Sequence, residues 1–403
     1  MKIGIIREGK TPPDKRVPFT PIQAAEIQQR ALDTTVVVQK SEVRAFADKE
    51  YEEQGLSIVD NLADCDVIFG VKEVNIDDLL PNKAYFFFSH TIKEQPYNRD
   101  LLRAVLERNI QLIDYECLTN ANGQRILGFG RYAGIVGCYN GFLAFGQRSG
   151  SFQLKPANEC DNRAEMEAEL PKINLPSSFK IALTGLGRVA GGALEILEKM
   201  GVKKVSPKDY LEQSFSEPVF TQLSVEDYFR KKDGSDFDRS EVFNHPERFE
   251  SDFFKYATET DLYIACHYWD SNGPNIFEKE EVAKAEFRIR TIADISCDIA
   301  GPIPTTIRPS TIAEPIYQVD RESLEEVQEV SDNSITVMAV DNLPCELPKD
   351  ASEDFGEELI DKIVPLFYGG DGDRIIERAT IAFGGKLTSH FEYLTDYVNG
   401  SAD

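Results

Sequence analysis

The chain has few of the residues that form metal sites or disulfide frameworks. Only four histidines occur among 403 residues, and none stands in the HExxH spacing that holds zinc. The seven cysteines form no CxxC pair, and an odd number in a long chain does not indicate a disulfide framework. We therefore expect no metal site, and we expect reduced thiols in the cytosol.

Long apolar runs and positive charge are also scarce. No stretch approaches the roughly 18 uncharged apolar residues of a membrane span, and the opening MKIGIIREGK resembles a buried strand more than an export signal. The formal net charge is −25, whereas nucleic acid and anionic membranes are bound chiefly by Lys and Arg. These features predict a cytoplasmic protein with no membrane span and no nucleic-acid partner.

Short apolar runs alternate with polar helical stretches in the N-terminal third. KIGIIRE, TTVVVQ, CDVIFGVKE, AYFFFSH and IQLIDYE are typical of buried strands, and PIQAAEIQQRA and YNRDLLRAVLERN are typical of helices. This alternation predicts a mostly parallel sheet covered on both faces, with functional loops at the carboxyl ends of the strands. Lys72 and His90 each follow such a strand.

A glycine-studded apolar stretch from Phe129 to Gly150 predicts a helix, which we expect to link two domains. Its small residues recur every three or four positions, so that the helix can pack closely against a neighbour. They are Ala133, Gly134, Gly137 and Gly141. Near the end of the chain, SITVMAV predicts one more strand, and EELIDKIVPLFYG and GDRIIERATIA predict two closing helices.

From Lys180 the pattern restarts as a strand, a glycine turn and a helix. The motif GxGxx(G/A) follows the strand IALT and opens the helical ALEILEKM. Its first glycine permits the tight turn, and the second lets the backbone approach a pyrophosphate at the helix N-terminus. The alternative is a strand-to-helix turn without a ligand. The predicted dinucleotide site comprises Gly185, Leu186, Gly187, Arg188 and Val189.

The acid that binds the cofactor ribose in such folds is missing from the expected place. It should stand about 20 residues after the turn, where the chain has Ser206 and Lys208, with Asp209 slightly late. Ser206 and Lys208 would suit the 2′-phosphate of NADP, so NAD and NADP both stay open. The polar excursion from Lys208 to Glu250 is interpreted as an insertion into the nucleotide fold. His267 stands at the end of a later predicted strand. It would lie near the nicotinamide ribose if the dinucleotide site is correct, and the alternative is an ordinary core or edge histidine.

Residues that transfer protons or bind anions gather at the predicted strand ends of the N-terminal third. Lys72 and His90 form a candidate acid/base pair. Cations at one sheet edge of an acidic protein indicate an anionic substrate, because Arg binds carboxylates through two hydrogen bonds. The alternative for each single cation is that it is an ordinary solvated charge. Lys72 and Glu73 could equally form a surface ion pair. The basic residues are Arg16, Lys72, His90, Lys93, Arg125 and Arg131.

Several motifs resemble those of the lysine-forming saccharopine dehydrogenases, in matching order across nearly the whole chain. The segments NHPERF and CHYWDSNGP are especially similar to the lysine-ketoglutarate reductase domain of the bifunctional lysine-degrading enzyme. The opening REGKTPPDKRVPFTP is shared with alanine dehydrogenase and the transhydrogenase α subunit, so it indicates only the superfamily. The family motifs are GVKEVN at Gly70, FFFSHTIKEQ at Phe86, GQRILGFGRYAG at Gly123, DISCD at Asp294 and VDNLPCELPKDAS at Val340.

The resemblance implies an α/β fold in which two Rossmann-like domains with mostly parallel sheets flank a central cleft. The substrate domain would span 1–131 and 346–403, and the dinucleotide-binding domain 132–345. Lys72 and His90 would match the family's acid/base pair, and Asp341 a site residue on the cofactor side. The substrate-binding positions would be Arg16, Glu73, Lys93, Glu116 and Arg125, with Arg131 added as a nearby cation.

The implied reaction interconverts saccharopine with L-lysine and 2-oxoglutarate by hydride transfer to or from NAD or NADP. The protein would act as a monomer or a small homo-oligomer on these small-molecule substrates. Two alternatives stay open. One is an alanine dehydrogenase-like enzyme for a smaller amino acid, and the other is a nucleotide-binding sensor without catalysis.

Overall fold

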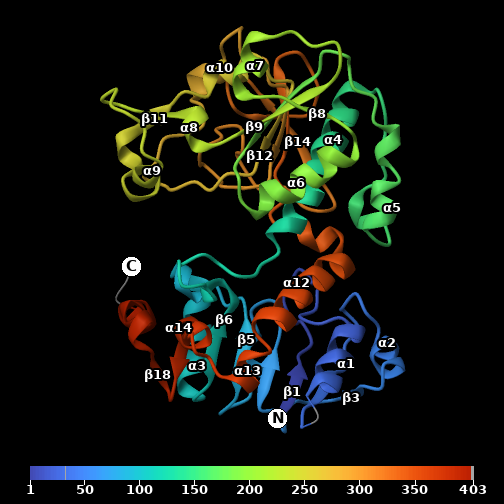
Figure 1. Ribbon diagram of the computed structural model, residues 1–403, viewed down its shortest axis with the longest axis vertical. Helices are drawn as coiled ribbons and strands as arrows, with labels where there is room; N and C mark the ends of the chain where they lie inside the picture. The colour runs from blue at the N-terminus through green and yellow to red at the C-terminus, as the bar shows by residue number, and fades with distance from the viewer. Residues whose placement is uncertain (32, 401–403) are drawn as a thin grey trace. The chain divides into compact units, whose positions relative to one another are not determined.

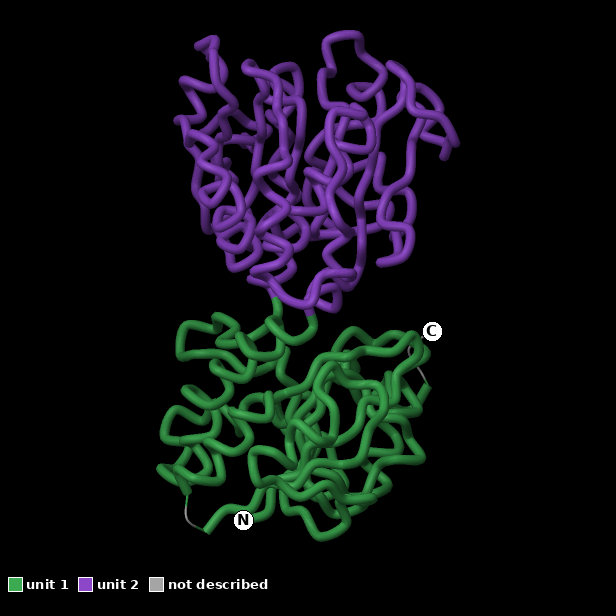
Figure 2. The backbone as a smooth tube through the Cα atoms, turned by 90° about the vertical axis from the view of Figure 1, so that its right-hand side faces the viewer, with its two compact units in different colours: residues 1–129, 348–403 green, residues 130–347 purple. Residues whose placement is uncertain are grey.

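A computed structural model describes residues 1–31 and 33–400 of the chain. It divides into two compact units, which Figure 2 colours separately. Unit 1 consists of residues 1–129 and 348–403, and unit 2 of residues 130–347. Each unit contains an eight-stranded, mostly parallel sheet with helices packed on it. The predicted fold class, α/β with two Rossmann-like sheets, is therefore confirmed.

The sheet of unit 1 has the strand order β18-β17-β6-β5-β4-β1-β2-β3 (Figure 1). The strands β1 to β6 are parallel to one another, and β17 and β18 are antiparallel to their neighbours. Their bounds are β1 (Lys2–Ile5), β2 (Thr35–Gln39), β3 (Ser57–Val59), β4 (Val67–Phe69), β5 (Ala84–Phe87), β6 (Gln111–Asp114), β17 (Thr380–Phe383) and β18 (Lys386–Leu387).

Helices cover both faces of this sheet because the strands are apolar on both sides. One core contains Ile3 and Phe86 with Phe355 of a C-terminal helix, and the other contains Ile68 and Tyr85 with Leu102. Both segments of unit 1 thus contribute to one fold. The helices are α1 (Pro21–Arg30), α2 (Asp48–Glu53), α3 (Arg99–Glu107), α12 (Pro348–Lys362), α13 (Leu366–Gly369), α14 (Ile375–Ala379) and α15 (Thr395–Asn399).

The C-terminal stretch GDRIIERATIA differs from its prediction. It was expected to form a helix, but the helix ends at Ala379 and the following residues form β17. This strand pairs with β6, and Ile381 and Ala382 are fully buried there. Burial against a sheet that was formed by distant residues outweighs the helical pattern of a short segment.

The sheet of unit 2 has the order β15-β14-β16-β13-β12-β7-β9-β8, and only β14 and β15 run antiparallel to their neighbours among the described strands of this sheet. A separate two-stranded sheet pairs β10 (Phe229–Lys231) with β11 (Phe249–Ser251). The strands of the main sheet are β7 (Lys180–Thr184), β8 (Lys203–Lys204), β9 (Val219–Leu223), β12 (Leu262–Ala265), β13 (Thr291–Asp294), β14 (Ile316–Asp320), β15 (Glu326–Val327) and β16 (Ser334–Met338).

Two helices of unit 2 pack with almost no space between their backbones. A Cβ atom on Gly134 of α4 would lie 1.8 Å from the carbonyl oxygen of Val189, and one on Gly192 of α6 would lie 1.9 Å from that of Arg131. The predicted glycine-studded helix and its close packing are thereby confirmed. The helices are α4 (Gly130–Ser149), α5 (Arg163–Glu167), α6 (Arg188–Lys199), α7 (Pro207–Glu212), α8 (Val225–Tyr228), α9 (Arg239–Asn244), α10 (Phe254–Ala257) and α11 (Lys279–Val282).

The polar excursion after Lys208 is more than an insertion outside the sheet. It contains β9, which lies between β7 and β8 with Leu223 opposite Thr184. Val219 and Leu223 are fully buried, which explains why this segment joins the sheet. The first strand after the glycine turn, β8, is therefore displaced to the edge.

The described residues contain few other special features. Within residues 1–31 and 33–400, none of the helices has the length and apolar character required to cross a bilayer. Nor does this part of the chain contain a group of three or more His, Cys, Asp or Glu side chains placed to hold a metal ion. All seven cysteines are free thiols.

Candidate active site

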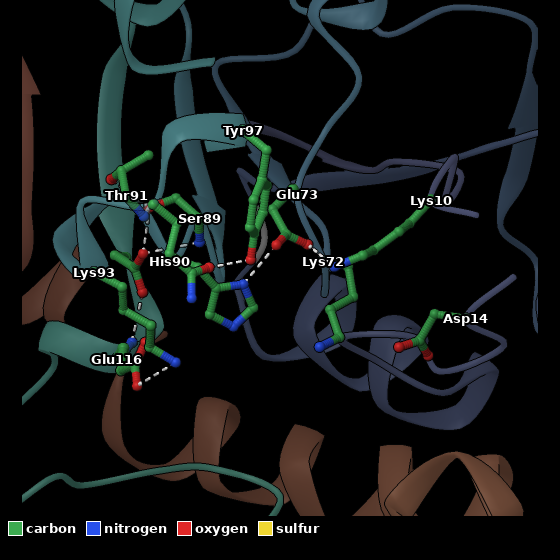
Figure 3. A network of polar contacts seen from close by, with 12 residues as sticks. Lys10, Asp14, Lys72, Glu73, Ser89, His90, Thr91, Lys93, Tyr97 and Glu116 are labelled. Atoms are coloured by element: carbon green, nitrogen blue, oxygen red, sulfur yellow. Dashed lines mark hydrogen bonds and ion pairs between the residues drawn. The ribbon is translucent and has the colours of Figure 1, made fainter. Parts of the chain in front are cut away.

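Four neighbouring parallel strands of unit 1 end at the same edge of the sheet, and polar residues follow each of them. β6, β5, β4 and β1 are adjacent in the strand order. The segments after their carboxyl ends meet in one polar network (Figure 3). The residues are Lys10, Asp14 and Arg16 after β1, Lys72 and Glu73 after β4, His90 and Lys93 after β5, and Glu116 after β6.

Glu73 joins a histidine and a lysine at the centre of this network. Its Oε1 lies 2.6 Å from Nδ1 of His90, and its Oε2 accepts a hydrogen bond of 2.7 Å from Nζ of Lys10. Burial opposes ionisation of Glu73, but the hydrogen bonds from His90 and Lys10 outweigh it and lower the pKa of this carboxyl to about 2. Glu73 is therefore a carboxylate that accepts from Nδ1–H, which leaves Nε2 of His90 for proton exchange.

His90 has a left-handed backbone conformation, with φ of 53°. Non-glycine residues adopt this conformation at a cost, although His does so more readily than bulkier residues. The turn directs the chain from β5 into the short 3₁₀ helix Thr91–Lys93. The backbone thus places the imidazole at the strand end instead of continuing the strand.

Lys72 is partly buried beside two other cations. Burial lowers the pKa of its ammonium, and the positive charges of Arg16 and Lys10 lower it further. The neighbouring carboxyl of Glu8 accepts hydrogen bonds from the backbone N–H groups of Val71 and Lys72, at 2.7 and 3.0 Å. Burial raises the pKa of Glu8 to about 8, despite these bonds. Glu8 thus fixes the backbone of Lys72 by a hydrogen bond, while the surroundings of the Lys72 side chain favour its neutral form.

Arg16 forms a buried ion pair with Asp14. Nε and Nη2 of Arg16 donate to the two carboxylate oxygens of Asp14, at 3.0 and 2.6 Å. The guanidinium also lies 4.1 Å from the ring centroid of Phe129. Burial opposes ionisation of Asp14, but the charge of Arg16 outweighs it and lowers the pKa of that carboxyl. The pair gives this edge a rigid guanidinium.

Glu116 holds two cations at the far end of the network. Its Oε1 accepts a 2.8 Å hydrogen bond from Nη2 of Arg125 and lies 3.6 Å from Nζ of Lys93. Burial opposes its ionisation, but the charges of Lys93 and Arg125 outweigh it and lower the pKa of Glu116. All predicted substrate and acid/base residues of unit 1 therefore lie at one sheet edge.

Sequence reasoning missed three members of this edge. Glu8, Lys10 and Asp14 stand in REGKTPPD, which follows β1. Lys72 and His90 were predicted because each is a polar residue that follows a buried parallel strand. Glu8, Lys10 and Asp14 also follow such a strand, so the same rule could have found them. They were missed because their contacts with Glu73, Lys72 and Arg16 join segments that are distant or lie in an irregular loop.

Arg131 is the one predicted substrate residue in unit 2. It lies on α4, and its guanidinium donates to both carboxylate oxygens of Glu195 on α6, at 2.6 and 2.9 Å. Glu195 also accepts a 2.8 Å hydrogen bond from Arg163. These contacts assign Arg131 a part in holding α4 against α6.

The glycine turn of unit 2 has the geometry that a dinucleotide requires. Gly185 has a φ of 104°, and a Cβ there would lie 2.5 Å from the carbonyl oxygen of Cys266. Its N–H donates to the carbonyl oxygen of Leu223 at 2.9 Å. A Cβ on Gly187 would meet no atom within 4 Å, and no side chain caps the start of α6 at that residue. Leu186, Gly187 and Arg188 are exposed. Backbone N–H groups at this helix start fit a pyrophosphate.

His267 follows β12, beside the glycine turn. Its Nδ1 lies 2.9 Å from Oγ1 of Thr184, and its buried Nε2 has no hydrogen-bond partner among the described residues. Burial lowers the pKa of His267 to about 4, so the ring is neutral. An unpaired buried nitrogen next to the turn fits a ligand group there. Asp341 is exposed and follows β16, two strands further along the sheet.

Ser206 is not brought to the glycine turn. It follows the edge strand β8, and β9 separates it from β7. Its hydroxyl caps α7, accepting from the N–H of Asp209 at 3.0 Å and donating to the Asp209 carboxylate at 2.8 Å. Lys208 is exposed in the same helix. The expectation that Ser206 stands at the ribose assumed that β8 adjoins β7.

Comparisons with known proteins find one family model over the N-terminal third of the chain and relatives over nearly all of it. Residues 4–136 match the family model described as alanine dehydrogenase/PNT, N-terminal domain. Alpha-aminoadipic semialdehyde synthase of Arabidopsis thaliana is 29% identical, over 97% of this chain and 41% of its own length. The mitochondrial protein of that name from Bos taurus is also 29% identical, over 94% of this chain and 46% of its own length. This chain thus spans less than half the length of these relatives.

A shorter relative aligns with the chain over about nine-tenths of both lengths. Saccharopine dehydrogenase [NAD(+), L-lysine-forming] of Candida albicans is 24% identical, over 90% of this chain and 91% of its own length. Among solved structures, L-alanine dehydrogenase superposes over 99% of both chains with a TM-score of 0.64 and 15% identity. A transhydrogenase from Sinorhizobium meliloti superposes over 96% of this chain and 99% of its own, with a TM-score of 0.59 and 12% identity. The predicted resemblance to these families is confirmed.

Proposed function

We propose that the chain is a cytosolic, nicotinamide-dependent oxidoreductase that interconverts saccharopine with L-lysine and 2-oxoglutarate. The observation that supports this proposal most directly is the contact between Glu73 and Nδ1 of His90, beside the partly buried Lys72. Two distinct proton-transfer groups at one edge suit a reaction in which an amine is oxidised and an imine is hydrolysed. The names of the relatives point to the same reaction.

Lys72 is proposed to accept the proton of the secondary amine. An amine accepts a proton only when it is neutral, and burial together with neighbouring cations favours the neutral form of Lys72. The substrate nitrogen then supplies the electron pair that forms the C=N bond as hydride leaves the adjacent carbon. In the reverse direction Lys72 returns the proton to the nitrogen.

His90 is proposed to serve the hydrolysis of that imine. Glu73 fixes the ring through Nδ1, so Nε2 accepts a proton from the attacking water and then gives it to the departing lysine nitrogen. As the C–N bond breaks, the ring, now neutral again, accepts the remaining O–H proton, and the carbonyl of 2-oxoglutarate forms. The Glu73 carboxylate stabilises the imidazolium that exists between the two transfers.

The surrounding cations are proposed to bind the substrate carboxylates. Even with Lys72 neutral, the cations Lys10, Arg16, Lys93 and Arg125 outnumber the ionised carboxylates at this edge, which are Asp14, Glu73 and Glu116. A local excess of positive charge in a protein with net charge −25 favours an anionic ligand at this place.

The glycine turn of unit 2 is proposed to hold NAD or NADP. Gly185, Gly187 and the first N–H groups of α6 would bind the pyrophosphate, with His267 near the turn. The bound nicotinamide supplies a hydride acceptor or donor. The protein residues hold the cofactor and move protons.

The test is an assay with saccharopine and either NAD or NADP, followed by the absorbance of the reduced nicotinamide. We expect turnover with at least one cofactor, and the reverse reaction with L-lysine, 2-oxoglutarate and the reduced form. Alanine with the same cofactors is the comparison substrate, because unit 1 matches the alanine dehydrogenase N-terminal family and the whole chain has that fold. Turnover of alanine alone would replace the proposal with that second candidate.

A further inference from the structure

We propose that Asp227, which lies in the polar excursion, binds the adenosine ribose of the cofactor and selects NAD over NADP. This inference rests on the proposed use of a nicotinamide cofactor. The sequence pattern alone had pointed to Ser206, which follows β8, as the residue at the ribose. The inference assigns the cofactor preference instead to a residue that follows β9. The excursion from Lys208 to Glu250 thereby acquires a role in cofactor recognition.

The first step is the strand order. In Rossmann sheets the ribose hydroxyls are bound by an acid that follows the strand adjoining the glycine-turn strand. In this chain that neighbour is β9, because Thr184 of β7 is opposite Leu223 and the N–H of Gly185 donates to the carbonyl oxygen of Leu223 at 2.9 Å. The side chain of Gln222 also donates to the carbonyl oxygen of Gly185 at 3.0 Å. The residues directly after Leu223 therefore lie beside the turn.

The second step is the position of the Asp227 carboxylate. Asp227 stands in the short helix α8, but its Oδ2 accepts hydrogen bonds from both the backbone N–H and the hydroxyl of Ser224, each at 2.8 Å. This capping box returns the carboxylate to the first residue after β9. Both bonds end on Oδ2, and Oδ1 is the oxygen assigned here to a ribose hydroxyl.

The third step is charge. A carboxylate accepts hydrogen bonds from the two hydroxyls of a ribose and repels a 2′-phosphate at the same position. The adjacent Glu226 is exposed and adds negative charge. Two cations oppose this charge: Arg188, which is exposed at the start of α6, and Lys204, whose ammonium lies 2.8 Å from the side-chain oxygen of Gln222. Only the two carboxylates directly follow the strand that adjoins the glycine turn, at the position that binds the ribose in such sheets, and there they favour NAD.

A second cap between a serine and an aspartate provides a matched control. At both helices the serine hydroxyl donates to the carboxylate of the aspartate three residues on, Ser206 to Asp209 at α7 and Ser224 to Asp227 at α8, each at 2.8 Å. The second bond differs, because the N–H of Asp209 donates to the Ser206 hydroxyl whereas the N–H of Ser224 donates to the Asp227 carboxylate. The difference is their place, because Ser206 follows the edge strand β8 and Ser224 follows β9, which adjoins the glycine turn. Asp209→Asn thus repeats the chemical change of Asp227→Asn one strand further from the cofactor.

The experiment measures binding of NADH and of NADPH to the full chain by nicotinamide fluorescence, without substrate. We expect the wild type to bind NADH at least ~10-fold more tightly than NADPH, as one charge-assisted contact allows. Asp227→Asn keeps an acceptor for Ser224 and removes the charge, so it should bring the two affinities within ~3-fold of each other. Asp209→Asn should leave the wild-type ratio unchanged. Thermal unfolding of each variant verifies that it is folded.

Several results would overturn the inference. Tighter binding of NADPH than of NADH by the wild type would do so. If Lys204→Ala then lost that preference, Lys204 would be the residue that binds the 2′-phosphate. An equal effect of Asp209→Asn and Asp227→Asn would remove the argument from strand order. Binding of neither dinucleotide would overturn the cofactor site as a whole. NADH binding with the expected ratio but no turnover of saccharopine would sustain this inference and overturn only the proposed function.

Discussion

The carboxyl edges of the two sheets present opposite kinds of surface. In unit 1 the edge consists of charged side chains in mutual contact, such as Glu73 with His90 and Lys10. In unit 2 the corresponding edge contains Gly185, exposed backbone at the start of α6, and the neutral, buried His267. The difference teaches that one fold presents titratable groups where long charged side chains follow the strands. It presents exposed backbone N–H groups where small residues follow them.

The two units also each contain a protonated buried carboxyl, but in different places. Glu8 lies beside Lys72 at the polar edge of unit 1, and burial raises its pKa to about 8. Glu346 lies in unit 2, where Nδ2 of Asn140 donates to it at 2.8 Å, and burial raises its pKa to about 8 as well. One carboxyl is part of the candidate active site, and the other belongs to the packing around α4.

The largest expected effect concerns the chemical edge of unit 1. Lys72→Met removes the proposed base, so kcat for saccharopine oxidation should fall by ~10²–10⁴-fold, the usual contribution of a general base. NADH binding should be unchanged, because the glycine turn is in the other unit. Lys49→Met, at an exposed lysine of α2, is the control and should retain full turnover. Retained turnover in Lys72→Met would assign the proton transfer to another group.

The next effect concerns the close packing within unit 2. Gly192→Ala places a methyl group 1.9 Å from the carbonyl oxygen of Arg131, so α4 and α6 must separate, at a cost of ~2–3 kcal/mol of stability. Gly191→Ala, one residue earlier in the same helix, meets no atom within 4 Å and should be neutral or stabilising by up to ~1 kcal/mol. Urea unfolding compares the two. Equal midpoints would contradict the contact between these helices.

A moderate effect concerns the buried carboxyl of unit 2. Because the folded-state pKa of Glu346 is about 8, above the ordinary 4.5, the folded protein retains a proton that the unfolded chain releases. The free energy of unfolding therefore falls as the pH rises from 4.5 to 8 and levels off above. Glu346→Gln cannot titrate, so it should gain on the order of 2 kcal/mol relative to wild type across this range.

Unfolding experiments at several pH values measure this difference. Glu325→Gln, at an exposed glutamate, is the control and should follow the wild-type pH dependence. A wild-type curve that rises between pH 4.5 and 8, with no difference in Glu346→Gln, would show that Glu346 is ionised in the folded protein.

The smallest effect separates two arginines that the sequence placed in one group. Arg125 contacts Glu116 at the polar edge of unit 1, so Arg125→Gln should raise KM for saccharopine ~10-fold, the loss of one charged hydrogen bond. Arg131 pairs with Glu195 in unit 2, so Arg131→Gln should change KM less than ~2-fold and cost at most ~1 kcal/mol of stability. Steady-state kinetics with saccharopine measures both. A larger KM effect for Arg131 would support its predicted place among the substrate-binding residues.

Much of the candidate site could be predicted from the sequence because it depends on where strands end. The runs VIFGV and YFFFS specify two buried strands, and Lys72 and His90 follow them by position alone. The glycine turn is equally local, since strand, glycines and helix are consecutive. These features need no knowledge of which strands are neighbours.

The rest required knowledge of neighbours. Ser206 was expected at the ribose because it follows the strand after the glycine turn, but β9 lies between β7 and β8. The stretch TIA was expected in a helix, but it belongs to β17, which pairs with β6. The pairing of Glu73 with His90 and Lys10 likewise joins three strand ends.

By itself, then, the sequence determined two α/β halves, the strand ends that bear Lys72 and His90, and the turn at Gly185, because periodic burial and turn chemistry act over a few consecutive residues. Only the tertiary structure decided that β9 adjoins the turn and that Glu73 holds His90. Strand order and ion pairing depend on contacts between residues far apart in the chain, and those contacts form only where burial of distant apolar segments brings them together.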